Sequence, residues 1–116
     1  MTMKPDPNYH DNAALRLYVE EVATQLGVEA AATWSEYGPP SMAYIALADR
    51  SPRFPGRFLM LQWTDTEGWN LALEPAGGED PVVLAAWPDR VYPMPLWLAE
   101  QVRLAMAEDQ APHCAL

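Results

Sequence analysis

The stretch from Arg57 to Pro75, RFLMLQWTDTEGWNLALEP, decides the fold, because two runs of alternating apolar residues flank a short polar segment. Alternation with a period of two is typical of β-strands, whose successive side chains point to opposite faces. The segment TDTEG between the runs is rich in residues that favour turns. The stretch therefore predicts a β-hairpin.

The register of this hairpin depends on the number of residues in its loop. An odd number unites six bulky residues on one face as three opposed pairs, Trp63 with Trp69, Leu61 with Leu71, and Leu59 with Leu73. A loop of four residues would shift the pairing by one and turn one strand's side chains to the opposite face. We favour the odd loop, because it gathers the bulky residues and leaves Asn70 and Glu74 facing away.

Outside the hairpin, prolines and glycines divide the chain into short runs of strand length. The predicted strands lie at about residues 28–36, 42–48, 57–64, 69–74 and 82–87. Connections this short join neighbouring strands antiparallel, because a parallel crossover needs about a dozen residues. The strands therefore form an antiparallel meander.

A helix is predicted on each side of the meander. Apolar residues recur at three- and four-residue spacing over 15–26, and Gly27 can end that helix in a left-handed conformation. A second helix begins near Pro95, since proline suits the first helical turn. The predicted fold class is α+β, with an N-terminal helix, a five-stranded antiparallel meander and a C-terminal helix.

The length of 116 residues predicts a single domain. We expect residues 10–108 to form it, with a flexible leader over 1–9 and a flexible tail over 109–116. The single Cys114 cannot form an internal disulfide, and no apolar run approaches the roughly 18 residues needed to cross a bilayer. With no apolar leader segment either, the chain is expected to be a soluble cytoplasmic protein.

The charge balance narrows the classes of partner. The chain has 7 Lys and Arg against 16 Asp and Glu, a formal net charge of -9. Such a surface repels the phosphates of nucleic acid and anionic lipid surfaces, so neither nucleic acid nor a membrane is expected as a partner. The acidity would also suit a mimic of nucleic acid or a binder of basic proteins, although charge of this kind commonly serves solubility alone.

The usual signatures of catalysis are missing from the sequence. There is no GxSxG, GxxxxGK[ST], GxGxxG, HExxH or CxxC motif. His10 beside Asp11 and His113 beside Cys114 match no structural zinc spacing. We therefore expect no catalytic residue, no metal and no cofactor, and a non-catalytic protein is favoured while an enzyme stays open.

The sheet is expected to be apolar on both faces. A helix is about 10 Å wide and strands lie about 4.8 Å apart, so two helices cover about one face of five strands. A second copy, another protein, a small apolar ligand, or the loops 35–41 and 87–95 could cover the remainder. One helix on each face, with loops filling the gaps, explains the pattern equally well.

If a partner covers the second face, the face carrying Trp63 packs on the helices. The predicted partner-binding residues on the other face are Phe58, Met60, Tyr44 and Met42. The remaining aromatic residues allow either core packing or a recognition cage, and their tendency to be buried favours packing. These residues are Tyr92, Trp34, Trp87 and Trp97.

The segment DRSPRFPGR departs from the acidic character of the chain. It holds Arg50, Arg53 and Arg57, three of the seven positive charges. Guanidinium groups bind carboxylates or phosphates bidentately, so this loop is a candidate anion site. The alternative is a solvated loop that balances nearby carboxylates.

Three segments carry a resemblance to a known family. LRLYVEEVATQLGV, AYIALADRSPRFPGRFLMLQWTDTEGWNLALEP and PVVLAAWPDRVYPMPLWLAEQV, over about residues 15–103, resemble a family of small actinobacterial proteins defined by a domain of unknown function. The FPGR loop and the W-x5-GW-x-LALE hairpin are its most specific parts. The resemblance implies an intracellular bacterial protein and supplies no substrate or catalytic residues.

Two functional hypotheses follow from the sequence. The first is a non-catalytic interaction or regulatory module that forms a homodimer, or binds another protein, through its apolar sheet face. The second is a small-molecule binder or enzyme, with a pocket between sheet and helices and the arginine loop holding an anionic group. A cavity beside Arg53 and Arg57 would favour the second hypothesis.

Overall fold

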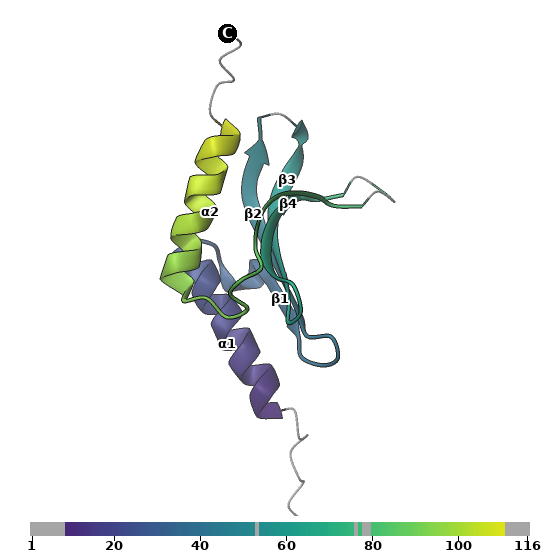
Figure 1. Cartoon of the computed structure of the whole chain (residues 1–116), viewed down its shortest axis with the longest axis vertical. Coiled ribbons are helices and arrows are strands. Elements are labelled where there is room, and N and C mark those ends of the chain that lie inside the picture. The colour runs from purple at the N-terminus through teal and green to yellow at the C-terminus, as the bar shows by residue number, and fades with distance from the viewer. Residues whose placement is uncertain (1–8, 53, 76, 78–79, 111–116) are drawn as a thin grey trace, which may run out of the picture.

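The computed structural model describes residues 9–52, 54–75, 77 and 80–110 (Figure 1). The elements in chain order are α1 (Tyr9–Gln25), the 3-10 helix η1 (Ala30–Ala32), β1 (Thr33–Glu36), β2 (Met42–Ser51), β3 (Phe54–Thr64), β4 (Gly68–Leu73), β5 (Val82–Trp87) and α2 (Pro95–Gln110). The strands form one sheet in the order β1-β2-β3-β4-β5, and every neighbouring pair is antiparallel. The predicted α+β fold with a five-stranded meander is confirmed.

The hairpin of β3 and β4 has the predicted register. Trp63 lies opposite Trp69, and the pairing ends at Thr64 and Gly68, so the loop has three residues. Gly68 has a φ of 73°, and a Cβ atom there would lie 2.9 Å from the carbonyl oxygen of Trp87. Glycine therefore both turns the chain and allows the close approach of the segment after β5.

The first strand is shorter than predicted. We expected a strand over 28–36, but η1 takes its first half and β1 begins at Thr33. The run of three alanines favours helical over extended backbone. The Thr33 hydroxyl then donates a hydrogen bond to the carbonyl oxygen of Ala30 at 2.7 Å, which fixes the change of direction.

Other boundaries lie close to the predicted ones. Strands β2 and β3 run further toward their shared loop than expected, with register shifts between Ala46 and Arg50 and between Arg50 and Ser51. Helix α1 begins at Tyr9 and α2 continues to Gln110. Tyr9 of the predicted leader 1–9 thus lies in α1, and Asp109 and Gln110 of the predicted tail 109–116 lie in α2. The rest of both segments lies outside the described residues.

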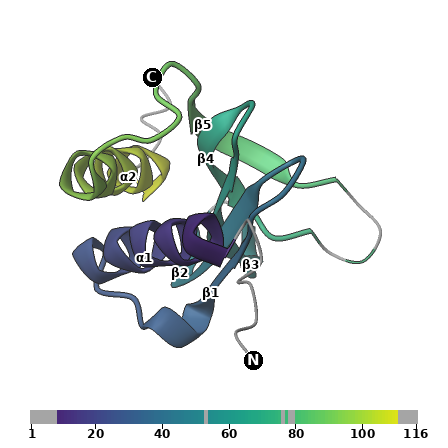
Figure 2. The same ribbon diagram turned by 90° about the horizontal axis from the view of Figure 1, so that it is seen from below.

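Both helices cover the same face of the sheet (Figures 1 and 2). The core between the layers contains apolar residues of both helices and of β2, β3 and β4: Leu15, Val19, Val22, Ala23, Ala43, Ile45, Leu47, Leu59, Leu61, Trp63, Trp69, Leu71, Leu73, Leu98 and Val102. The helices cover the Trp63 face, as the hypothesis of a partner on the other face required. An arrangement with one helix on each face, which the sequence left open, does not occur.

The tryptophans of this inner face carry polar atoms that hold the layers together. The Trp69 indole N–H donates to the Tyr18 hydroxyl of α1 at 3.3 Å, and that hydroxyl donates to the carbonyl oxygen of Pro93 at 2.6 Å. The Trp63 indole N–H donates to the carbonyl oxygen of Val91 at 2.6 Å. Residues 91–93, which lead into α2, are thereby held on the same face as α1.

Neither helix in the described part of the chain combines the length and the apolarity that crossing a bilayer requires.

Candidate functional site

The outer face of the sheet, which we define as the face opposite the helices, carries the candidate site. Ile45, Leu61 and Leu71 are fully buried under the helices. Since side chains alternate along a strand, the residues on either side of each of these point to the outer face. One row across the first four strands consists of Trp34, Tyr44, Gln62 and Asn70, which are paired in register.

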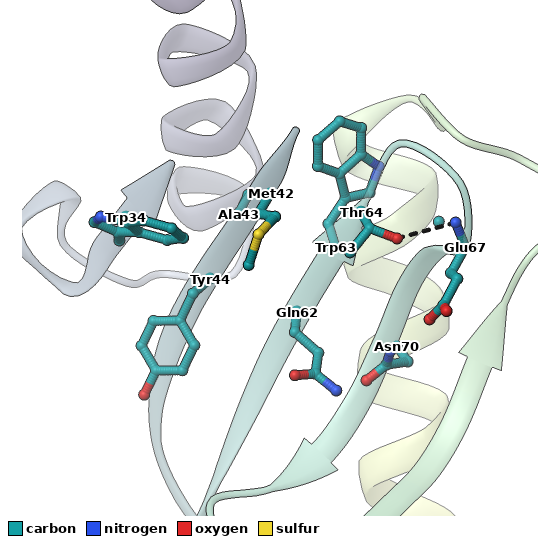
Figure 3. Close-up of a pocket in the computed structure, with 10 residues that line it drawn as sticks. Trp34, Met42, Ala43, Tyr44, Gln62, Trp63, Thr64, Glu67 and Asn70 are labelled. Carbon is teal, nitrogen blue, oxygen red and sulfur yellow. Dashed lines mark hydrogen bonds between the residues drawn. The ribbon is translucent and has the colours of Figure 1, made fainter. Parts of the chain in front are cut away.

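This row lines an open pocket of about 380 Å³ on the outer face (Figure 3). The full lining is Trp34, Met42, Ala43, Tyr44, Gln62, Trp63, Thr64, Glu67, Gly68 and Asn70. In Figure 3 the rings of Trp34 and Tyr44 and the Met42 side chain lie on the β1 and β2 side, while Gln62, Asn70 and Glu67 lie on the β3 and β4 side. The pocket thus has one apolar wall and one polar wall, an arrangement typical of recognition sites.

A hydrogen bond from the Tyr44 hydroxyl to the Glu74 carboxylate crosses the face beside this pocket. Tyr44 lies on β2 and Glu74 follows β4, so the ring spans the intervening strand β3. Burial, followed by the hydrogen bond and the negative charge of Glu74, raises the pKa of Tyr44 to about 12. Tyr44 is therefore a neutral hydrogen-bond donor at physiological pH.

The polar wall contains an unsatisfied acceptor. The Oδ1 atom of Asn70 is buried and accepts no hydrogen bond among the described residues. By contrast, the Thr64 hydroxyl accepts a hydrogen bond from the Glu67 backbone N–H at 3.0 Å and closes the turn (Figure 3). A buried acceptor without a donor costs stability, so its presence in a pocket wall suits a ligand or partner that supplies a donor.

The four predicted partner-binding residues do lie on the outer face, but they differ in accessibility. Met42 and Tyr44 line the pocket, and Met42 and Phe58 are each 38% exposed. Phe58 lies further along β3, where the Arg50 guanidinium stacks 4.5 Å from the centre of its ring. Met60 is only 4% exposed, because it lies on the strand that Tyr44 spans, and it offers little contact area.

Of the lining residues, only Met42 and Tyr44 were predicted as site residues; Gln62 and Asn70 were not, and for Trp34 packing was favoured over a recognition cage. The favoured hairpin register already turned Asn70 and Gln62 away from the tryptophans, so the signal for their shared face was present. The pairing of β1 with β2 that brings Trp34 beside Tyr44 had no such signal.

The structure describes only part of the predicted anion site. Arg50 contacts Phe58, Arg57 is partly buried near the start of β3, and Arg53 lies outside the described residues. The pocket is at the Thr64 end of β3, and neither Arg50 nor Arg57 lines it. Anion binding by this loop stays a prediction.

No three His, Cys, Asp or Glu side chains gather as metal ligands within the described ranges. The pocket also holds no pairing of a nucleophile with a base among its lining residues. Its functional groups are amides, hydroxyls, a carboxylate and aromatic rings, which are able to form hydrogen bonds and apolar contacts.

The model of a family of unknown function (DUF6292) matches residues 18–104. The chain belongs to this family. The matched segment includes all five strands, so the outer-face pocket lies within the DUF6292 region. Comparisons with curated proteins and with solved structures gave no match.

Proposed function

We propose that the protein is a non-catalytic binding module that forms a homodimer through the outer face of its sheet. The observation that carries the proposal is the placement of both helices on the inner face (Figure 2). The helices therefore leave the pocket and its apolar wall on the outer face uncovered. A cytoplasmic location in an actinobacterial cell, which the composition and the resemblance predict, belongs to the same proposal.

Exposed apolar side chains spread over the outer face support an extended contact. Trp34 is 46% exposed on β1 and Val83 is 51% exposed on β5, at opposite edges of the sheet. The five strands have 4, 10, 11, 6 and 6 residues, so at about 3.3 Å per residue and about 4.8 Å between strands the flat area of the sheet is roughly 600 Å². Protruding side chains and the adjoining turns enlarge this area toward the roughly 800 Å² that each partner buries in a standard interface.

The polar groups of the face suit pairing with an identical face. In a two-fold interface the same patch meets itself, so each group must complement its own copy. The amides of Gln62 and Asn70 carry both donors and acceptors, and they can therefore pair with the same amides of a second chain. Such pairing would supply a donor to the Asn70 Oδ1 atom.

Charge repulsion opposes self-association, so the proposal predicts that the dimer depends on the salt concentration. Each chain has a net charge of -9, and Glu67 lines the pocket. Salt screens the repulsion between two such chains, with a Debye length of about 8 Å at 0.15 M and about 3 Å at 1 M. An apolar interface opposed by charge should therefore strengthen as the salt concentration rises.

Light scattering after size-exclusion chromatography tests the dimer at low and high salt. The wild-type chain should show the mass of a dimer, with a larger dimer fraction at high salt. Val83→Asp on the outer face should give a monomer, and Leu104→Asp, on a residue 61% exposed on α2, should remain dimeric. A wild-type monomer at both salt concentrations would overturn the proposal, as would equal dissociation of the two variants.

A second candidate function is the binding of a small molecule in the same pocket. The volume of about 380 Å³ lies within the roughly 300–1,000 Å³ of known ligand pockets, and Asn70 Oδ1 has no donor in the part of the chain that the structure describes. The fitting ligand is flat and apolar with an N–H donor at its edge. A monomeric chain whose Asn70 amide resonance responds saturably to such a compound would favour this function over the dimer.

A further inference from the structure

A second group of aromatic residues lies at the end of the molecule where four segments meet. Tyr18 comes from α1, Tyr37 from the loop after β1, Asp65 from the turn after β3, and Tyr92 from the connection before α2. A cavity of about 400 Å³ is lined by Tyr37, Gly38, Pro39, Ser41, Asp65 and Tyr92. A cavity of about 280 Å³ is lined by Asp11, Ala14, Leu15, Tyr18, Tyr37 and Tyr92.

Tyr37 and Tyr92 line both cavities, so the two spaces adjoin across these side chains. Neither cavity is part of the outer-face pocket, since the lining residues are different. The site therefore requires its own account.

The backbone around the cavities is held by hydrogen bonds from separate elements. The Tyr37 backbone N–H donates to Asn12 Oδ1 of α1 at 3.1 Å, and the Asp65 backbone N–H donates to the carbonyl oxygen of Ser41 at 3.2 Å. The Tyr92 ring lies 5.3 Å from the Trp63 ring and 5.8 Å from the Tyr18 ring, centre to centre. These contacts set the walls in place before any ligand arrives.

The charge of this site is negative. Asp65 lines the larger cavity, Asp11 lines the smaller one, and no Lys or Arg is among the described residues that line either. Burial, and then the charge of Asp65 together with Tyr37 and Asp11, raises the pKa of Tyr92. The two carboxylates thus act on the same space from different elements.

One oxygen of the site lacks a donor. The Oδ1 atom of Asp65 is buried and accepts no hydrogen bond from the described part of the chain. A buried carboxylate oxygen calls for a cation that carries an N–H group, because a charge-assisted hydrogen bond offsets the cost of removing it from water.

We propose that Tyr37, Tyr92, Asp65 and Asp11 form a binding site for a guanidinium group. Guanidinium is planar and weakly hydrated, stacks on aromatic rings, and donates paired hydrogen bonds to carboxylates. A compact ammonium is more strongly hydrated and loses more on entering an aromatic site. The group can come from a free guanidino compound or from an arginine side chain of a polypeptide.

The test titrates the full chain with methylguanidinium and with methylurea, a neutral molecule of nearly the same shape. The Trp63 indole N–H resonance is the reporter, because this group donates to Val91 beside Tyr92. We expect a saturable shift with methylguanidinium and binding at least about tenfold weaker with methylurea, since the carboxylates contribute only to the cation. Methylammonium should also bind more weakly than methylguanidinium. Equal affinity for methylurea, stronger binding of methylammonium, or no saturable shift would overturn the proposal.

Two carboxylates in one turn give a matched pair of variants. Asp65→Asn should lower the affinity for methylguanidinium about tenfold. Glu67→Gln removes the same charge but lies outside both cavities, so it should change this affinity by no more than about twofold. The amide spectrum shows whether Asp65→Asn alters the structure of the turn. In that case Tyr37→Leu serves as the second variant, and it should also lower the affinity for methylguanidinium. Equal effects of the two carboxylate variants, with Tyr37→Leu unchanged, would refute the site.

A further arm separates the two sources of the group. A short arginine peptide that binds more tightly than methylguanidinium indicates a polypeptide partner, and equal affinity indicates a free guanidino compound. Because none of these measurements depends on the oligomeric state, they are independent of the proposed homodimer.

Discussion

The two faces of the sheet are built from the same strands by the same alternation, yet they differ in how their polar atoms are satisfied. On the inner face, the indole N–H groups of Trp63 and Trp69 both donate hydrogen bonds, to the Val91 carbonyl oxygen and to the Tyr18 hydroxyl. On the outer face, Asn70 Oδ1 is buried and accepts none among the described residues. The indole N–H groups of the inner face are thus satisfied within the chain, whereas the outer face keeps a buried acceptor without a donor among the described residues, and the proposed binding surface rests on this difference.

The largest expected difference between the faces concerns side-chain truncation. Trp69 is 0% exposed and Met42 is 38% exposed. We predict that Trp69→Ala lowers the free energy of unfolding by about 3–5 kcal/mol, because it leaves a cavity under both helices. Met42→Ala should cost less than about 1 kcal/mol. Urea denaturation followed by circular dichroism measures both values.

These measurements belong at protein concentrations where light scattering gives a monomer, so that association does not add to the stability. A cost for Met42→Ala as large as that for Trp69→Ala would mean that the outer face is as much a core as the inner one. That result would remove the contrast from which the binding proposal starts.

Hydrogen bonds provide the next contrast. Tyr18→Phe removes the acceptor of the Trp69 indole N–H and the donor to Pro93, and Trp69 is fully buried. We predict a loss of about 1–3 kcal/mol in the free energy of unfolding, because a buried donor is left without a partner. Tyr44→Phe removes the hydrogen bond to Glu74, which is only partly buried, so water replaces it at a cost of about 0.5–1.5 kcal/mol.

Urea denaturation of both variants in one buffer shows which substitution lowers the free energy of unfolding more. If Tyr44→Phe proves the more damaging of the two, the bond across β3 would be a principal support of the sheet, and the outer face would not be free to rearrange around a partner.

The sequence predicted the inner face well because its information is local. The loop between Trp63 and Trp69 is short, and the period of two allows only one register that unites the bulky residues. The predicted start of the first strand, at residue 28, was wrong because Ala30–Ala32 form a helical turn in place of a strand. Both outcomes are decided within a few residues.

The side on which the helices pack could not be predicted in the same way. An amphipathic pattern shows which stripe of a helix is buried, but it does not show which face of a sheet receives that stripe. Here the choice depends on bonds between distant segments, such as that from Tyr18 to Pro93. The cavities between Tyr37 and Tyr92 likewise combine four segments of the chain, and no spacing in the sequence records their meeting.

Alkaline pH provides a third comparison of the faces. Burial is the main cause that raises the pKa of Tyr18, on the inner face, and of Tyr44, on the outer face, from 10.0 to about 12. Between pH 10 and about 12 the unfolded chain therefore loses these protons while the folded chain keeps them. Because the folded state then binds more protons, the free energy of unfolding falls as the pH rises through this window, and the contribution is complete below pH 10.

Urea midpoints measured from pH 9 to pH 12 should show this decline in the wild type. The decline should be smaller in Tyr18→Phe and in Tyr44→Phe, since each lacks one titrating hydroxyl. A wild-type chain with a constant midpoint across the window, or Phe variants with the full wild-type slope, would contradict the raised pKa values.

The smallest expected change in the free energy of unfolding is the only one that raises it. Asn70→Leu replaces a side chain of similar size whose buried Oδ1 accepts no hydrogen bond among the described residues, so the monomer should be unchanged or gain up to about 1 kcal/mol. Asn12→Leu is the control, because Asn12 Oδ1 accepts a hydrogen bond from the Tyr37 backbone N–H and its loss should destabilise the fold. A gain for Asn70→Leu, measured by urea denaturation and accompanied by loss of the dimer, would mean that this amide is kept for recognition at the expense of stability. A loss beyond about 1 kcal/mol would place Asn70 among the structural residues of the sheet and transfer the case for a binding surface to the apolar wall of Trp34, Met42 and Tyr44 alone.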